Sequence, residues 1–144
     1  MAQFIEFVTN HPLLSLAWVV IFLIIVGGWI KARFSAIRQV SPTELTMLVN
    51  RQDGVVLDIR GEEEFKKGHI AGARHITASQ ISEQKLNGLE KQKDAPIIVV
   101  CQSGMSAPKS AAELTKQGFS NVSVLQGGMG AWSGASLPVV KLKR

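Results

Sequence analysis

Cysteine is scarce in this sequence, which has one such residue, Cys101, among its 144 residues. A single cysteine cannot form an internal disulfide, so the chain is suited to a reducing compartment. With no second cysteine and no close cluster among its 3 histidines, the sequence predicts no metal site. We also predict no organic cofactor.

Dense clusters of positive charge are absent too. The formal net charge is +5, and three of the basic residues, Lys31, Arg33 and Arg38, directly follow an apolar run. From Gln39 onward, 13 basic and 10 acidic residues nearly balance. A domain without a basic patch interleaved with aromatic residues is not expected to bind nucleic acid.

Charge is missing altogether from residues 13–30, LLSLAWVVIFLIIVGGWI. These 18 residues would form a helix of about 27 Å, which is close to the hydrocarbon thickness of a bilayer. A signal peptide is the alternative, but it usually carries lysine or arginine before its apolar region. Here Glu6 precedes the run and the basic residues follow it. The sequence therefore predicts an uncleaved transmembrane helix in contact with the lipid bilayer.

The basic residues after the run also predict an orientation, because lysine and arginine favour the cytoplasmic side of a membrane. We expect a single-pass inner-membrane protein with its N-terminus outside and its C-terminal domain in the cytoplasm. Residues 1–12 would be a short extracytoplasmic tail, 13–30 the transmembrane helix, 31–39 a basic juxtamembrane linker and 40–144 one domain.

Predicted strands and helices alternate along residues 40–144. Ser41 and Glu44 have the spacing of a capping box, so a helix is expected to follow and to end near Asn50. Strands are predicted at VVLDI, ARHI, IIVV and NVSVL, with short helices between them and a last one around Trp132. This alternation is typical of an α/β domain with a mainly parallel central sheet flanked by helices.

Cys101 follows the apolar strand IIVV and precedes a polar loop that contains Gly104. Ser106 is the expected N-cap of the next helix, with Pro108 in its first turn. Backbone N–H groups at a helix N-terminus favour a nearby anion, so a thiolate is favoured over a thiol at this place. A buried structural thiol is the simpler interpretation of a lone cysteine. The strand, the glycine loop and the helix start together favour a reactive one.

Three stretches resemble the rhodanese-like family. VLDIRGEEEFKKGHIAGARHI resembles its Asp-x-Arg and Gly-His-Ile signature, CQSGMS its six-residue active-site loop, and GFSNVSVLQGGMGAWSGASLPV its closing stretch. They occur in the family's order between about Val40 and Val140. With the predicted anchor, the chain is similar to the membrane-tethered single-domain bacterial type.

The resemblance implies a rhodanese-like fold and a sulfurtransferase. Cys101 would be the nucleophile that takes a sulfane sulfur from a donor, such as thiosulfate or another persulfide, and passes it to a thiol, a protein or cyanide. The residues of the persulfide-binding loop would be Gln102, Ser103, Gly104, Met105 and Ser106. Asp58, Arg60 and Lys109 are candidate supporting residues, the first two also as a structural ion pair. The family loop often has arginine where this chain has Gln102 and Ser106, so thiosulfate is expected to bind poorly.

Two other functions compete with sulfur transfer. A cysteine phosphatase needs a phosphate-binding arginine six residues after the cysteine. That position is Ala107 here, and the loop is one residue too short. The stronger alternative is a non-catalytic, membrane-tethered module that docks a membrane or cytoplasmic partner protein.

Overall fold

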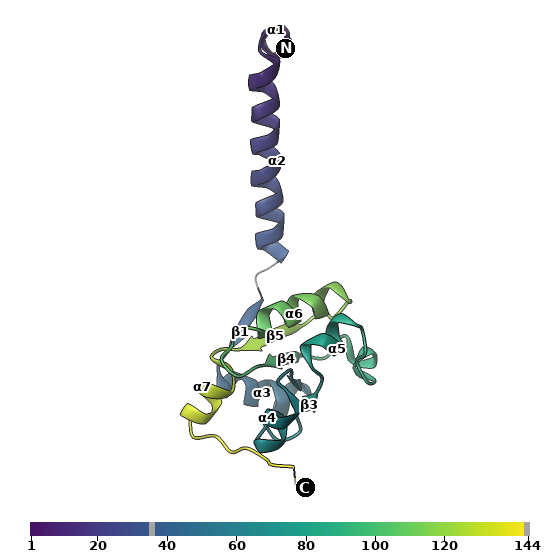
Figure 1. Cartoon of the computed structure of the whole chain (residues 1–144), viewed down its shortest axis with the longest axis vertical. Helices are drawn as coiled ribbons and strands as arrows, with labels where there is room; N and C mark the ends of the chain where they lie inside the picture. The colour runs from purple at the N-terminus through teal and green to yellow at the C-terminus, as the bar shows by residue number, and fades with distance from the viewer. Residues whose placement is uncertain (35–36, 143–144) are drawn as a thin grey trace. The chain divides into compact units, whose positions relative to one another are not determined.

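The computed structural model describes residues 1–34 and 37–142. The chain divides into two compact units, Met1–Ala36 and Ile37–Arg144. The first contains helices α1 (Ala2–Asn10) and α2 (Pro12–Phe34), and the second contains the sheet and the remaining helices (Figure 1). The segment predicted as an N-terminal tail is therefore mostly helical.

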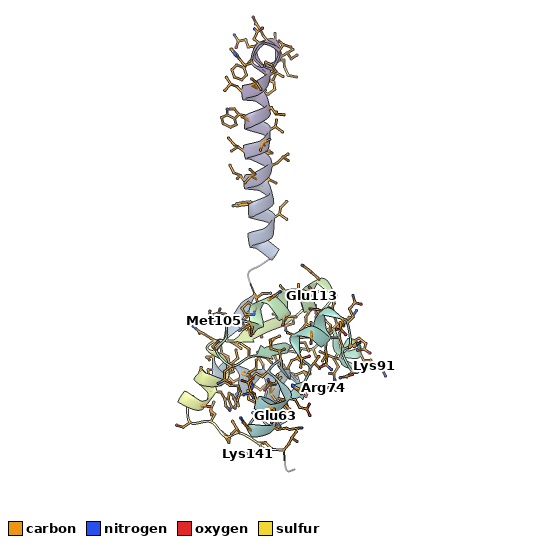
Figure 2. All side chains as sticks on the ribbon, viewed as in Figure 1. Glu63, Arg74, Lys91, Met105, Glu113 and Lys141 are labelled. Carbon is orange, nitrogen blue, oxygen red and sulfur yellow. The ribbon has the colours of Figure 1, made fainter. Side chains whose placement is uncertain are left out.

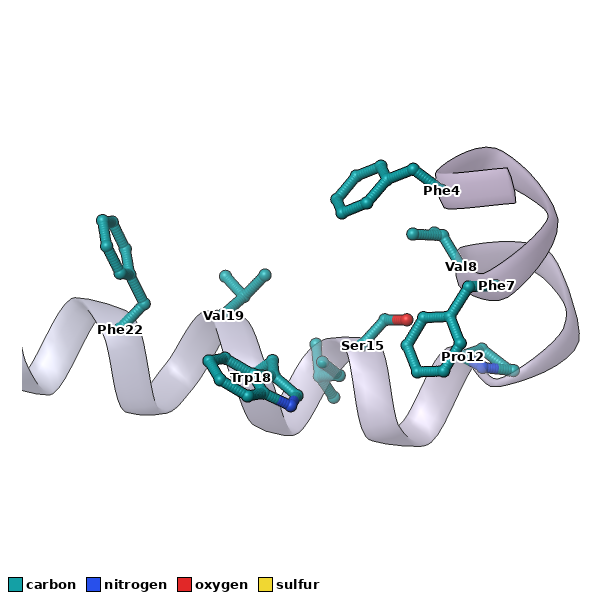
Figure 3. Close-up of a pocket in the computed structure, with 9 residues that line it drawn as sticks. Phe4, Phe7, Val8, Pro12, Ser15, Trp18, Val19 and Phe22 are labelled. Carbon is teal, nitrogen blue, oxygen red and sulfur yellow. The ribbon is translucent and has the colours of Figure 1, made fainter. Parts of the chain in front are cut away.

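Helix α2 is long and apolar enough to cross a membrane. Its candidate span, Pro12–Ile30, has a mean hydropathy of 2.6 and buries none of its residues inside the protein. Figure 3 shows that α1 and α2 share an apolar groove, in which Phe4, Phe7 and Val8 of α1 lie near Val19 and Phe22 of α2. The candidate span thus exposes apolar side chains along its length.

The segment predicted as a basic linker, residues 31–39, is more regular at both ends than expected. Helix α2 continues to Phe34, and strand β1 (Arg38–Val40) begins before the predicted domain boundary. Residues 35 and 36 of this segment lie outside the described residues. Strand β1 was missed because three residues, of which Arg38 and Gln39 are polar, carry no apolar alternation.

The second unit contains one five-stranded parallel sheet of order β1-β5-β4-β2-β3. Its other strands are β2 (Val55–Asp58), β3 (Arg74–His75), β4 (Ile97–Val100) and β5 (Val122–Leu125). The predicted α/β class and the parallel sheet are confirmed. Strand β4 lies at the centre, between β5 and β2.

Helices cover both faces of this sheet (Figure 1). Helix α5 (Ala78–Ser82), the 3₁₀ helix η1 (Leu89–Gln92) and α6 (Ala107–Lys116) pack against one face. Helices α3 (Pro42–Gln52) and α7 (Gly128–Gly134) pack against the other. Helix α4 (Glu62–Lys67) follows β2 and ends at Gly68. The predicted capping box at the start of α3 is present, with Ser41 N donating to Glu44 Oε2 at 2.9 Å.

Strand β4 shows why the sheet needs helices on both sides. Ile97 and Val99 belong to the core on the α6 face, whereas Ile98 and Val100 belong to the core on the α3 face. All four side chains are 0% exposed. Burying each of them stabilises the fold by roughly 1.5–3 kcal/mol. A strand that is apolar on both faces therefore occupies the centre and delivers the next residue, Cys101, to the carboxyl edge of the sheet.

Candidate active site

Cys101 lies where β4 ends, at the centre of the carboxyl edge of the sheet. In open parallel sheets this edge is where ligands bind. The residue is 2% exposed and packs with Ala107 and Ala111 of α6, while Gln102, Ser103, Met105 and Ser106 of the following loop are exposed. The sulfur thus lies beneath a solvent-facing loop.

Hydrogen-bond donors surround the sulfur. The Gly104 amide donates to Cys101 Sγ at 2.9 Å, and Gly104 has a φ of +82°, a conformation that other residues rarely adopt. Burial raises the pKa of the Cys101 thiol, but donors from the Ser106 hydroxyl and from the amides of Ala107, Ser106 and Gly104 outweigh it. The pKa therefore lies below its ordinary value, and the thiolate is favoured.

Ser106 occupies the predicted N-cap position of α6, but its side chain acts elsewhere. Its φ of −89° and ψ of −22° are helical, and its side chain accepts no capping hydrogen bond. A capping serine needs an extended backbone for its oxygen to reach the N–H groups of the first turn. A hydrogen bond from the Ser106 side chain instead lowers the pKa of Cys101. The predictions of the helix start and of the N-cap position were correct, and the side chain of Ser106 makes no capping hydrogen bond.

Asp58 and Arg60 form a buried ion pair at the end of β2. Their exposed fractions are 1% and 8%. Arg60 Nη2 donates to Asp58 Oδ2 at 2.8 Å, and Arg60 Nε lies 3.0 and 3.1 Å from the two carboxylate oxygens. Because the opposite charges of Asp58 and Arg60 lie within hydrogen-bond distance of each other, the pair adds little net charge to the site.

The remaining donors of Arg60 reach the neighbouring loops. Arg60 Nη2 donates to Gly68 O at 2.7 Å, and Nη1 donates to Gln102 Oε1 at 3.3 Å. The sheet register explains the second contact, because Asp58 pairs with Val100 in parallel strands. Residues two positions further along, Arg60 and Gln102, therefore lie side by side. Arg60 thus stabilises the loop that follows Cys101.

The other predicted site residues are spread over the surface of the loop and of α6. Met105 has an exposed fraction of 86% and lies at the surface of the domain (Figure 2). Lys109 is exposed in the first turn of α6, and Ser103 is exposed without a donor role toward the sulfur. None of the loop residues Gln102–Ser106 carries a charge.

Sequence reasoning missed two contributors to the loop. The Ala107 amide, just beyond the predicted cradle, is one of the donors to the sulfur. The turn from β5 into α7 is the other, since Met129 N donates to Cys101 O at 2.8 Å and Gly130 N to Gln102 O at 3.0 Å. The adjacent Gly127 and Gly128 were the available signal for this close backbone approach.

Comparison with known proteins identifies the class of the domain. Residues 41–135 match the model of the rhodanese-like domain, which is well over half of the chain. The chain therefore belongs to the rhodanese-like domain family.

Particular relatives extend the match. Over 143 residues the chain is 40% identical to the uncharacterized protein YibN of Escherichia coli strain K12, covering 99% of this chain and all of that protein. It is 35% identical over 100 residues to the thiosulfate sulfurtransferase GlpE of Pseudoalteromonas translucida strain TAC 125, covering 69% of this chain and 92% of GlpE.

A solved structure shows the same fold. The crystal structure of a rhodanese-related protein from Thermoplasma volcanium superposes with a TM-score of 0.62 at 26% identity. The match covers 72% of this chain and 97% of that protein. The rhodanese fold predicted from the three motifs is confirmed.

Proposed function

We propose that this protein is a membrane-anchored sulfurtransferase that carries a sulfane sulfur as a persulfide on Cys101. The observation that carries the proposal is the group of donors around the sulfur. The Gly104 amide at 2.9 Å, the Ser106 hydroxyl and the Ala107 amide favour an anion at this position. Both the attacking thiolate and the terminal sulfur of a persulfide are anions, so one cradle serves both states.

The transfer takes place in two balanced steps. The Cys101 thiolate attacks the outer sulfur of a donor such as thiosulfate, the donor S–S bond breaks, and sulfite leaves with the bonding electron pair. A new S–S bond then joins Cys101 to the transferred sulfur, which carries a negative charge. In the second step a thiolate or cyanide attacks this outer sulfur, and Cys101 leaves as a thiolate. The lowered pKa of Cys101 favours both the attacking and the leaving form.

The charge of the loop bears on the choice of donor. Residues Gln102–Ser106 are uncharged, and Arg60 is largely neutralised by Asp58. Thiosulfate is a dianion, and this loop offers it only neutral hydrogen-bond donors. A persulfide donor carries at most one negative charge at its reacting sulfur. We therefore infer that thiosulfate binds weakly and that a thiol persulfide is the better donor.

We further propose that helix α2 anchors this chemistry at a membrane. The support is the candidate span Pro12–Ile30, followed by the basic residues Lys31, Arg33 and Arg38. By the positive-inside rule the N-terminus lies outside and the catalytic domain in the cytoplasm, at the inner membrane. The donor and the acceptor would thus be cytoplasmic thiols or proteins that reach the membrane surface.

The direct test is the intact mass of the full chain in detergent after exposure to thiosulfate and, separately, to a thiol persulfide. We expect a gain of one sulfur mass that cyanide reverses, with the persulfide donor acting at lower concentration. The Cys101→Ala variant should gain nothing under either condition. Absence of an adduct on the unmodified chain with both donors would refute the proposed activity.

A second candidate function is the docking of a partner protein without catalysis. The observation in its favour is Met105, whose side chain is 86% exposed in an uncharged loop. Methionine is enriched in protein contact surfaces. The two functions differ in their need for sulfur: in cells, Cys101→Ser should abolish the activity of a sulfurtransferase and leave that of a docking module intact.

A further inference from the structure

The turn that joins β5 to α7 holds the backbone of the Cys101 loop. Met129 N donates to Cys101 O at 2.8 Å, and Gly130 N donates to Gln102 O at 3.0 Å. Neither bond involves the sulfur. Together they hold the carbonyl groups of Cys101 and Gln102, in the part of the loop that leads to the Gly104 amide.

This approach requires that residue 128 has no side chain. Gly128 has a φ of +58°, and a Cβ built there would overlap the carbonyl oxygen of Cys101. The same Cβ would lie 2.8 Å from Gly104 N and 2.9 Å from the carbonyl carbon of Gln102. All three neighbours are backbone atoms, which cannot move aside by a change of rotamer.

Gly104 in the loop likewise has no room for a side chain. A Cβ at Gly104 would lie 2.9 Å from Gly127 N and 3.4 Å from Gly128 N. Gly104 N is also the atom that donates to Cys101 Sγ at 2.9 Å. A side chain at residue 128 would therefore displace an amide that donates to the sulfur.

We propose that Gly128 is a positioning residue for the Cys101 nucleophile: its missing side chain lets the α7 turn hold the loop where the Gly104 amide donates to the sulfur. It does not touch the substrate. This role rests on the proposed function in one respect: the thiolate that the loop holds is taken to be the sulfur carrier. The hydrogen-bond geometry itself does not depend on which reaction Cys101 performs.

The test is the pH dependence of Cys101 alkylation by iodoacetamide, followed by intact mass on the full chain in detergent. A Gly128→Ala substitution should move the midpoint of the profile upward by about one pH unit, which is about a tenfold loss of rate below the midpoint. An unchanged midpoint in a folded Gly128→Ala protein would overturn the proposal.

Matched glycines separate the loop contact from other effects. At Gly130 an added Cβ lies 3.6 Å from Gln102 O, an ordinary contact, so Gly130→Ala should leave the midpoint unchanged. At Gly72, with a φ of +78°, a Cβ meets nothing within 4 Å, so Gly72→Ala reproduces the backbone strain alone. Equal shifts in Gly128→Ala and Gly72→Ala would contradict a role of the contact with the loop.

Thermal unfolding shows whether each variant folds. A purely structural role for Gly128 would lower the melting temperature and leave the alkylation midpoint in place, which would overturn the proposal. If Gly128→Ala shows no cooperative transition, Gly104→Ala tests the same interface through its milder 2.9 Å approach to Gly127 N. An upward midpoint in Gly104→Ala supports the proposal, and an unchanged one refutes it.

The alkylation experiment can be distinguished from a failure of the proposed function. Alkylation requires a thiolate but no sulfur donor. A chain that forms no persulfide, yet shows the shifted profile in Gly128→Ala, would lose the sulfurtransferase assignment and keep Gly128 as a positioning residue. The reverse outcome would keep the assignment and remove Gly128.

Discussion

At the scale of residues, the reactivity of Cys101 depends on a balance between burial and hydrogen bonds. Burial disfavours the thiolate, and the donors from Ser106, Ala107 and Gly104 reverse that preference. Two of these three residues donate only through the backbone. The Ser106 hydroxyl is the one donor among them that a substitution can remove without disturbing the main chain.

Removing this hydroxyl should raise the pKa of Cys101. We expect Ser106→Ala to shift the alkylation profile toward higher pH by roughly half to one unit, because one hydrogen bond to an anion is lost at an exposed site. Below the new midpoint the thiol is more often protonated, so alkylation slows there, and well above it the rates converge. Ser103→Ala is the control, since Ser103 is equally exposed and does not donate to the sulfur. Equal shifts in both variants would contradict the assignment.

Asp58 and Arg60 act on the site indirectly, through the loop that follows Cys101. Their ion pair is buried, and Arg60 connects it to Gln102 and to the Gly68 carbonyl. Buried pairs are weak evidence for stability, although removing one partner leaves a charge without compensation. The pair therefore fits the structural interpretation, in which it fixes the end of β2 against the active-site loop.

At the scale of elements, strand β1 connects the start of the domain to the turn before α7. Val40 is 0% exposed, and Gln126 N donates to Val40 O at 2.9 Å, one residue before Gly127. Strand β1 pairs with β5 alone, in parallel register. The strand thus supports the segment from which the α7 turn begins.

A chain starting at Ile37 and one starting at Ser41, which keeps the cap of α3, should differ in stability. The longer one keeps β1 and the partly buried Ile37, and the shorter one exposes the edge of β5. We expect a lower urea midpoint for the shorter chain, because its free energy of unfolding loses the roughly 1.5–3 kcal/mol that burial of Val40 contributes. A third chain starting at Gln39 should fall between them. Identical midpoints would show that β1 contributes nothing to the domain.

At the scale of the whole molecule, the chain consists of two compact units, Met1–Ala36 and Ile37–Arg144. The first exposes large apolar side chains along its length, and the second has its own two-sided core. Such a division suits an anchor and a domain that fold by different rules, one in lipid and one in water.

Alkaline carbonate extraction of cell membranes tests this division. The full chain should remain in the membrane pellet, because Pro12–Ile30 is apolar and uncovered by protein. The chain that starts at Ile37 should appear in the supernatant with a cooperative unfolding transition. Release of the full chain by carbonate would contradict a membrane span. Protease digestion of inside-out vesicles, which should cleave the domain, checks the predicted orientation.

Much of this molecule followed from sequence patterns that depend on neighbours in the chain. The capping box at Ser41, the apolar strand Ile97–Val100 and the helix after Cys101 were each predicted because their determinants lie within a few residues of one another. The uncharged run of residues 13–30 likewise predicted α2 from its own composition. Short-range propensity and the hydrophobic period carry this information locally.

Tertiary structure decided which groups face the sulfur. The Ser106 side chain makes no capping hydrogen bond and instead lowers the pKa of Cys101, as does the Ala107 amide. The α7 turn holds the loop from Gly128, 27 positions beyond Cys101. Arg60 reached Gln102 only because parallel pairing aligned Asp58 with Val100. Such contacts depend on sheet register and on close backbone approach. Neither is encoded in the spacing of residues along a single segment.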